Sequence, residues 1–155
     1  MSLLSFFAWC ENSSTGEAIR ASNWLFPAIE SFHLLALAVI GGSVLVVNLR
    51  LCGLGPKSSP ASQLWKDSQP WLRGSYLVMI ISGLLMFTSE ATKLYYHEAF
   101  WVKMASLLLA TAFTLTVVRR VALAGAGPAQ EKLTAIISLL LWAGVGVGGR
   151  WIGFS

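Results

Sequence analysis

The chain has 155 residues, of which 55% are hydrophobic and only 12% charged. Soluble domains are roughly half apolar and a quarter charged, so this composition indicates a single integral membrane domain over residues 1–155. The net charge of +4 does not indicate nucleic-acid binding, because the basic residues stand at the ends of apolar runs and form no patch with interleaved aromatics.

The N-terminal residues 3–9 are apolar but too few to cross a bilayer. We expect a short interfacial helix or a plug against the bundle. Ser14 and Glu17 have the spacing of a capping box, which predicts a second short helix that ends at Ala21. The first residues lack the basic start and the cleavage site of a signal peptide, so we keep them in the mature protein.

The first long apolar run, residues 24–50, predicts a membrane-spanning helix. No charged residue occurs from Ser31 to Asn48, and at a rise of about 1.5 Å per residue the run exceeds the ~30 Å thickness of a bilayer core. Glu30 and His33 lie one turn apart near its start. Polar groups at this depth are costly unless they are paired or functional, so these two residues are the first candidates for a site.

Three more apolar runs follow, each bounded by charges or by glycine and proline. We expect the second span to begin at Pro70-Trp71, after a polar loop over 57–69, and Gly125 and Gly127 to stop the third. Gly144 and Gly148 have the GxxxG spacing of close helix packing. The sequence thus predicts an all-α, four-helix transmembrane bundle with a short N-terminal interfacial helix, and with spans at about 24–50, 71–94, 99–119 and 132–151.

Charge predicts the orientation of these spans. The side with the 1–2 and 3–4 loops has two acidic residues and seven basic ones: Arg50, Lys57, Lys66, Arg73, Arg119, Arg120 and Lys132. The other side has four basic and five acidic residues. The positive-inside rule therefore places both termini on the periplasmic side of a bacterial inner membrane.

This topology gathers polar residues in the outer half of the bundle: Glu30, His33, Glu90, His97, Glu98, Lys103 and Arg150. We expect Glu30 to pair with Lys103 or Arg150, because an intramembrane carboxylate needs a cation. Such a network, with Arg50 at the far end of the first span, either serves a site or only fixes the helix register.

His33 is a candidate axial ligand for haem b or another tetrapyrrole, since four-helix membrane bundles hold haem with inward-facing imidazoles. His97 lies about 13 Å shallower by helix rise, so Met86 matches the depth of His33 better as a second ligand. A single histidine also suits a chlorophyll magnesium, and His33 with His97 and a methionine suits copper. Alternatively His33 is a structural imidazole bonded to a hydroxyl or to Glu30.

Four motifs carry a resemblance that covers nearly the whole chain: Pro27-x-x-Glu30-x-x-His33, Asn48-Leu49-Arg50-Leu51-x-Gly53, Pro70-Trp71 and Phe100-x-x-Lys103. The sequence resembles an uncharacterised family of bacterial four-helix membrane proteins, which implies importance for Glu30, His33, Arg50 and Lys103 but no activity. Where that family has Asp, this chain has Asn48. A looser likeness, in architecture alone, is to four-helix cytochrome b and copper-resistance membrane domains.

These patterns favour a small integral membrane subunit of a redox or energy-transducing complex, with a haem-like group or a quinone near His33. The alternatives are a scaffold or assembly subunit with a structural polar network and an accessory subunit of a pigment complex. No catalytic set is apparent in the sequence. Exposed apolar and small-residue helix surfaces lead us to expect lipid contact and either a homo-oligomer or a larger membrane complex.

Overall fold

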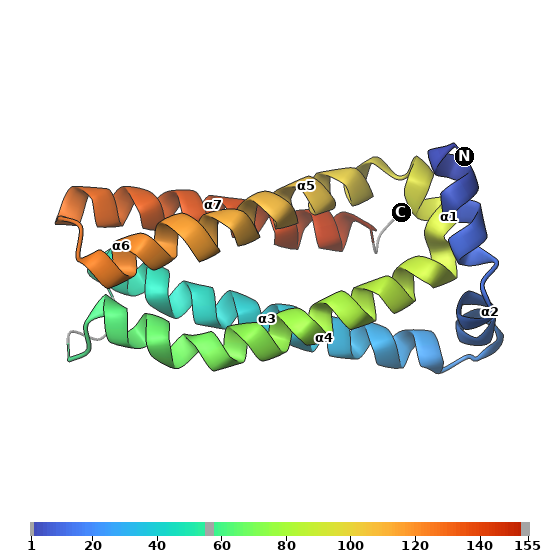
Figure 1. Ribbon diagram of the computed structural model, residues 1–155, viewed down its shortest axis with the longest axis horizontal. Coiled ribbons are helices and arrows are strands. Elements are labelled where there is room, and N and C mark those ends of the chain that lie inside the picture. Colours follow the sequence, from blue (N-terminus) through green and yellow to red (C-terminus); the bar gives the residue numbers. More distant parts are fainter. Residues whose placement is uncertain (1, 55–57, 153–155) are drawn as a thin grey trace.

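The computed structural model describes residues 2–54 and 58–152. This part of the chain contains helices and short turns and no strand (Figure 1). In chain order the elements are α1 (Leu3–Glu11), α2 (Ser14–Ala21), α3 (Leu25–Leu51), α4 (Ala61–Tyr96), α5 (Glu98–Phe113), the π-helical turn η1 (Thr114–Val118), α6 (Arg119–Ala124) and α7 (Pro128–Ile152).

Four of the helical segments are long and apolar enough to cross a membrane: Leu25–Leu51, Ala61–Tyr96, Glu98–Ala124 and Pro128–Trp151. Only 22% to 28% of the residues in their most apolar windows are buried within the protein. Most of their apolar surface is therefore available to lipid, as expected where helices pack through one stripe and face acyl chains with the rest. The protein is a multi-pass, all-α membrane bundle, which confirms the predicted fold class.

The four spans form two antiparallel hairpins. α3 packs along α4, and α5 packs along α7, while the two hairpins meet through α3 with α7 and through α6 with α4 (Figure 1). The α3–α4 and α6–α7 connections lie at one end of the bundle, which we call the loop end. Both chain termini lie at the opposite end, which we call the terminal end (Figure 1).

The apolar core is concentrated toward the loop end. Side chains from α3, α4, η1, α6 and α7 form one buried cluster there: Ala36, Ile40, Val44, Val47, Leu51, Trp65, Leu72, Met79, Val118, Val121, Ala122 and Ala135. Toward the terminal end the contacts are aromatic instead. Phe7 of α1 is buried with its ring 4.9 Å from that of Phe87 and 5.3 Å from that of Tyr95.

The second span begins earlier than its sequence suggested. We predicted a polar loop over 57–69, of which residue 57 lies outside the described residues, but α4 already begins at Ala61. Trp65 and Leu72, two turns apart, are buried and hold this face to the core. Pro70 lies within the helix, at an exposed position, where its ring costs a backbone hydrogen bond but displaces no packed neighbour. Tertiary packing thus overrides the local polar composition.

The ends of two spans are set by glycines in the left-handed region. Gly53, after α3, has φ of 79°, and Gly125, after α6, has φ of 64°, a conformation that glycine adopts without a Cβ penalty. Gly125 stops the third span as predicted. That span nevertheless extends to Ala124, beyond the expected residue 119, and α7 begins at Pro128, because proline suits the first position of a helix.

The two short helices were expected, and the structure shows what they contact. α2 has the predicted extent, although its cap is Ser13, whose hydroxyl accepts from the backbone N–H of Gly16 at 3.2 Å. Both α1 and α2 pack against α4 near a kink at Glu90, where φ is −139° and ψ is 31°. Figure 1 shows them lying across the terminal end of the bundle.

The kink leaves backbone groups of α4 without their helical partners, and α1 and α2 supply replacements. Arg20 donates to the carbonyl of Ser89 at 3.0 Å, and the Glu11 carboxylate accepts from the backbone N–H of Thr92. Arg20 also donates to the Glu11 carbonyl at 2.8 Å, which joins the two short helices. Arg20 and Glu11 therefore stabilise a break that would otherwise expose polar backbone in an apolar region.

Candidate functional site

His33 is inside the bundle, between α3 and α4. Its side chain is 9% exposed, and its Nδ1 atom lies 2.9 Å from the hydroxyl of Ser82 on α4. The neighbouring Gly83 permits this approach, because a Cβ there would lie 3.3 Å from Cε1 of His33. The first span thus presents its imidazole inward, as the sequence analysis expected, and α4 has small residues opposite it.

The hydrogen bonds of Ser82 define the tautomer of His33. The Ser82 hydroxyl donates to the carbonyl of Val78 at 2.6 Å, which is the common local bond of serine in a helix. Its single hydrogen is then committed, so Ser82 accepts from Nδ1 of His33. Nδ1 carries the proton, and Nε2 is left with a lone pair. Within the described residues no side chain bonds to Nε2, and the backbone of Met79 is the other polar neighbour of the ring.

Lys103 lies within electrostatic range of His33, on the other hairpin. It is partly buried against α7: a Cβ on Gly148 would lie 3.2 Å from the Cα of Lys103, and one on Gly149 would lie 3.9 Å from its Nζ. Gly148 therefore has the close-packing role that the GxxxG spacing predicted. Over residues 2–54 and 58–152 no carboxylate lies within ion-pair distance of Lys103.

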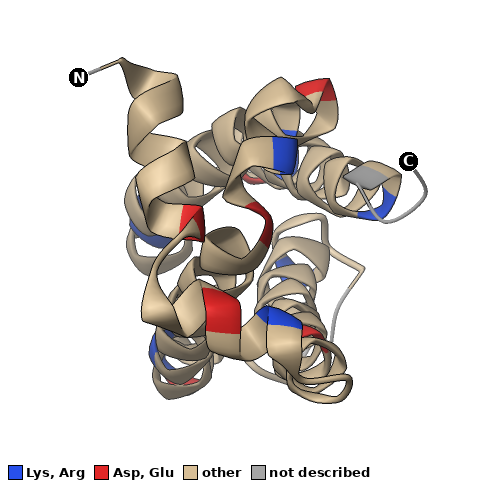
Figure 2. Cartoon of the chain, turned by 90° about the vertical axis from the view of Figure 1, so that its right-hand side faces the viewer, with Lys and Arg blue, Asp and Glu red and all other residues tan. Residues whose placement is uncertain are grey.

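Glu30 has no partner of the kind that we predicted. The one salt bridge within the described part of the chain joins Lys93 to Glu90 at 3.9 Å. Glu30 is partly buried one turn before His33, and Arg150 lies on an exposed part of the last turns of α7. Charged residues of both signs occur at the terminal end (Figure 2), but Glu30 is paired with neither Lys103 nor Arg150.

Arg50 belongs to the other end of the bundle. Its Nε atom donates to the carbonyl of Ser59 at 2.8 Å, which ties the end of α3 to the segment before α4. By helix rise Arg50 lies about 25 Å from His33 along α3. Two residues earlier, the buried Asn48 donates to Ser138 of α7 at 2.9 Å. Arg50 is therefore separate from the polar residues around His33.

The two proposed partners of His33 as ligands differ in position. Met86 lies one turn beyond Ser82 on α4, toward the terminal end, so it shares the side of α4 that carries the partner of His33. His97 lies at the junction of α4 and α5, roughly 22 Å along the helix from Ser82. Within the described ranges no three His, Cys, Asp or Glu side chains form a metal-binding group.

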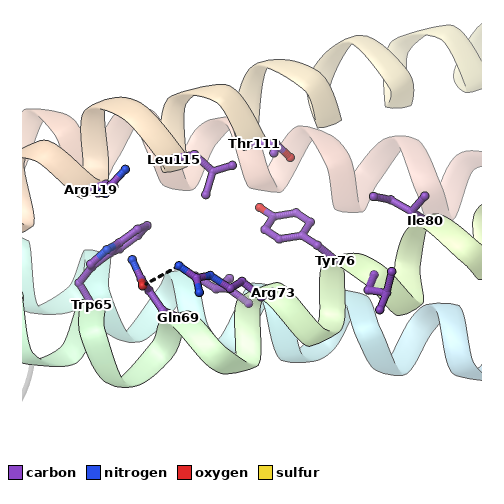
Figure 3. Close-up of a pocket in the computed structure, with 10 residues that line it drawn as sticks. Trp65, Gln69, Arg73, Tyr76, Ile80, Thr111, Leu115 and Arg119 are labelled. Atoms are coloured by element: carbon purple, nitrogen blue, oxygen red, sulfur yellow. Dashed lines mark hydrogen bonds between the residues drawn. The ribbon is translucent and has the colours of Figure 1, made fainter.

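A second polar feature, which sequence reasoning missed, is a cavity of about 600 Å³ toward the loop end. It lies between α4 and the rod α5–η1–α6, and its polar lining residues come from both sides (Figure 3). They are Trp65, Gln69, Arg73, Tyr76, Thr111 and Arg119. In the sequence, Arg73 and Arg119 served only to predict the orientation of the spans in the membrane. They are 46 residues apart, which gives no indication that they share a cavity.

Comparison with known families decides membership. The model of a family of unknown function, DUF6644, matches residues 6–155. The chain belongs to this family. The match includes both short helices except for the first residues of α1, so the DUF6644 domain comprises the four spans together with the segment that holds the Glu90 kink. No curated protein and no solved structure matches the chain.

Proposed function

We propose that this DUF6644 protein is a small integral membrane subunit of a redox or energy-transducing complex and that His33 holds a haem-like tetrapyrrole through Nε2. One observation carries the proposal: Nδ1 of His33 lies 2.9 Å from the Ser82 hydroxyl, whose own hydrogen is directed at the Val78 carbonyl. In this arrangement Nδ1 donates to Ser82, and Nε2 is the nitrogen that keeps its lone pair. Histidines that ligate metals nearly always donate their other ring N–H to a fixed acceptor, which sets the tautomer and the orientation of the ring.

The surrounding residues fit such a group. Ser82 orients the imidazole, Gly83 lets the ring lie close against α4, and Met86 on the same side of α4 is the candidate for a second axial position. Lys103 has no carboxylate partner in the described chain. Its ammonium group would pair with the acidic substituents of the tetrapyrrole. When bound, a haem of this kind supplies one-electron transfer.

A quinone is the second candidate, and Lys103 favours it. Lys103 offers hydrogen-bond donors within electrostatic range of His33, whose Nε2 is an acceptor. A donor and an acceptor on facing hairpins suit the carbonyl and hydroxyl groups of a quinone and a quinol. His33 would then accept a proton at Nε2, and Lys103 would hold an oxygen atom.

The setting that we propose is the inner membrane of a bacterium, with both termini on the periplasmic side, as the charge distribution favours. The apolar surface of the spans favours a homo-oligomer or association with larger membrane subunits. The subunit has no catalytic activity of its own in this proposal. It transfers electrons to or from a partner, or in a pigment complex it holds chlorophyll as an accessory subunit.

An absorption spectrum of the purified protein tests the proposal. A bound haem gives a Soret band that His33→Ala abolishes and that His97→Ala, a control at the α4–α5 junction, preserves. A pigment lost equally in both variants overturns ligation at His33. If the folded protein is colourless, quinone in a solvent extract that depends on Lys103 supports the second candidate. If neither group is present, a scaffold with a structural polar network replaces both.

A further inference from the structure

The cavity between α4 and the rod α5–η1–α6 is polar at one end and apolar at the other. Arg73 and Arg119 lie toward the loop end with Gln69, while Ile80 lines the part nearer the middle of the span (Figure 3). Leu77, one turn before Ile80 on α4, also lines the cavity. None of its ten lining residues is acidic. A ligand of this cavity therefore has an anionic head and an apolar body.

The position of the two guanidinium groups matches the membrane surface. Arg73 follows the exposed Trp71, which is 67% exposed, and tryptophan in a span prefers the level of the lipid headgroups. The helix from Trp71 to Tyr96 measures about 38 Å, enough for the bilayer core and part of one interface. Arg73 and Arg119 are thus placed at headgroup depth, and the apolar part of the cavity is at acyl-chain depth.

Two buried polar groups in the cavity wall have no hydrogen bond of normal geometry within the described residues. They are the indole N–H of Trp65, whose side chain is 2% exposed, and the hydroxyl of Tyr76, which points toward Thr111 (Figure 3). Buried polar groups without partners are rare and costly. Tyr76 lies one turn, about 4.5 Å, deeper than Arg73. Oxygen atoms of a ligand at these levels would satisfy both groups.

We infer that this cavity binds one anionic phospholipid, with its phosphate between Arg73 and Arg119 and an acyl chain along Leu77, Ile80 and Leu115. Basic pockets between transmembrane helices are known to select anionic headgroups, whose phosphate oxygens accept from guanidinium groups. The cavity volume of about 600 Å³ is also in the range of natural ligand sites. The phosphate end of this site is separate from His33, since Arg73 lies about 13 Å along α4 from Ser82. Ile80, at the other end, is two residues from Ser82 and lies about 200° around the helix from it.

Native mass spectrometry of the full, delipidated chain tests the inference with phosphatidylglycerol and phosphatidylcholine of identical acyl chains. We expect one phosphatidylglycerol to bind, and the double variant Arg73→Gln/Arg119→Gln to weaken it roughly thirtyfold, at the usual contribution of a basic residue near anionic lipid. The control Lys66→Gln/Arg120→Gln removes the same charge from outside the cavity and should change little. Equal binding of both lipids, or an equal loss in the control, overturns the inference.

A second variant separates a lipid from free phosphate. Leu115→Trp fills the apolar part of the cavity and leaves both arginines in place, so it should weaken phosphatidylglycerol while thermal unfolding stays close to that of the wild type. Inorganic phosphate serves as the competing probe. If phosphate displaces phosphatidylglycerol at millimolar concentration and Leu115→Trp has no effect, the cavity is an anion site without a lipid chain, and the inference is wrong.

Discussion

Arg20 of α2 bonds to the backbone of α4 at Ser89, a residue 69 positions further along the chain, with its Nη1 atom 3.0 Å from the carbonyl oxygen. The same guanidinium holds the carbonyl of Glu11, whose carboxylate accepts from the N–H of Thr92 beyond the kink. A short N-terminal segment thus satisfies both sides of the break in a membrane-spanning helix.

Replacing Arg20 should therefore loosen the terminal end. We expect Arg20→Gln to lower the free energy of unfolding by about 1–2 kcal/mol, because hydrogen bonds from a charged donor to α4 and α1 are lost. Thermal unfolding in detergent, followed by circular dichroism, measures the change. Arg120→Gln, at an exposed position of α6, is the matched control. Equal melting temperatures for both variants would show that the contact adds no stability.

Gly16 tests how closely α2 lies on the kink. A Cβ at this position would come within 2.3 Å of the Thr88 carbonyl oxygen and 2.7 Å of that of Glu11. Gly16→Ala should thus displace α2 and cost about 1–3 kcal/mol, as overpacking does. Gly41→Ala meets nothing within 4 Å and is expected to be neutral or slightly stabilising. Identical unfolding curves for the two variants would contradict the packing of α2.

Attachment of the short helices should depend on pH through Glu11. Hydrogen bonds from the side chain and the backbone of Thr92 lower the pKa of Glu11 in the folded protein. A lowered pKa means that this stabilisation is complete above the unfolded value near 4.5 and is lost as the pH falls through the folded value. The accessibility of Cys10 to a pH-insensitive thiol reagent should increase as the pH falls through that range. Glu11→Gln should remove this pH dependence. An unchanged profile in Glu11→Gln would assign the effect to another group.

Gly83 should control the geometry of His33. A Cβ at Gly83 would lie 3.3 Å from Cε1 of the imidazole, so Gly83→Ala must move the ring by a few tenths of an ångström or strain its bond to Ser82. Under the proposed function, we expect a shifted Soret band and several-fold weaker retention of the pigment. Gly74→Ala, on the same helix with open space around it, should leave both unchanged. Similar spectra for the two variants would place the pigment elsewhere.

The helical class, the four spans and the inward position of His33 could be predicted because length, charge and apolar runs are properties of consecutive residues. The partner of His33 could not. α3 is apolar on nearly all sides, so its sequence does not indicate which residue of α4 faces the imidazole. A serine within a helix commonly bonds to a carbonyl of its own helix, and Ser82 does so to Val78. Its second role as an acceptor depends on the packing of two helices.

The start of α4 and the kink at Glu90 were missed for a related reason. The residues from Ala61 to Pro70 are polar and contain a proline, which locally favours a loop, yet Trp65 anchors them to the core. Glu90 interrupts a stretch without local breakers, and its partners Arg20 and Glu11 are distant in the sequence. Expected ion pairs of Glu30 are absent among the described residues, because opposite charges at similar depth need not share a helix face.

The π-helical turn η1 gives the third span two rotational settings. Before it, α5 packs on α7, and after it, α6 contacts α4. One inserted residue changes the phase of an α-helix by about 100°, so a single rod serves neighbours on different sides. Deletion of one residue within Thr114–Val118 would restore an uninterrupted α-helix. It would rotate Arg119 away from Arg73 and so remove the cavity, while none of the residues that contact His33 would be substituted.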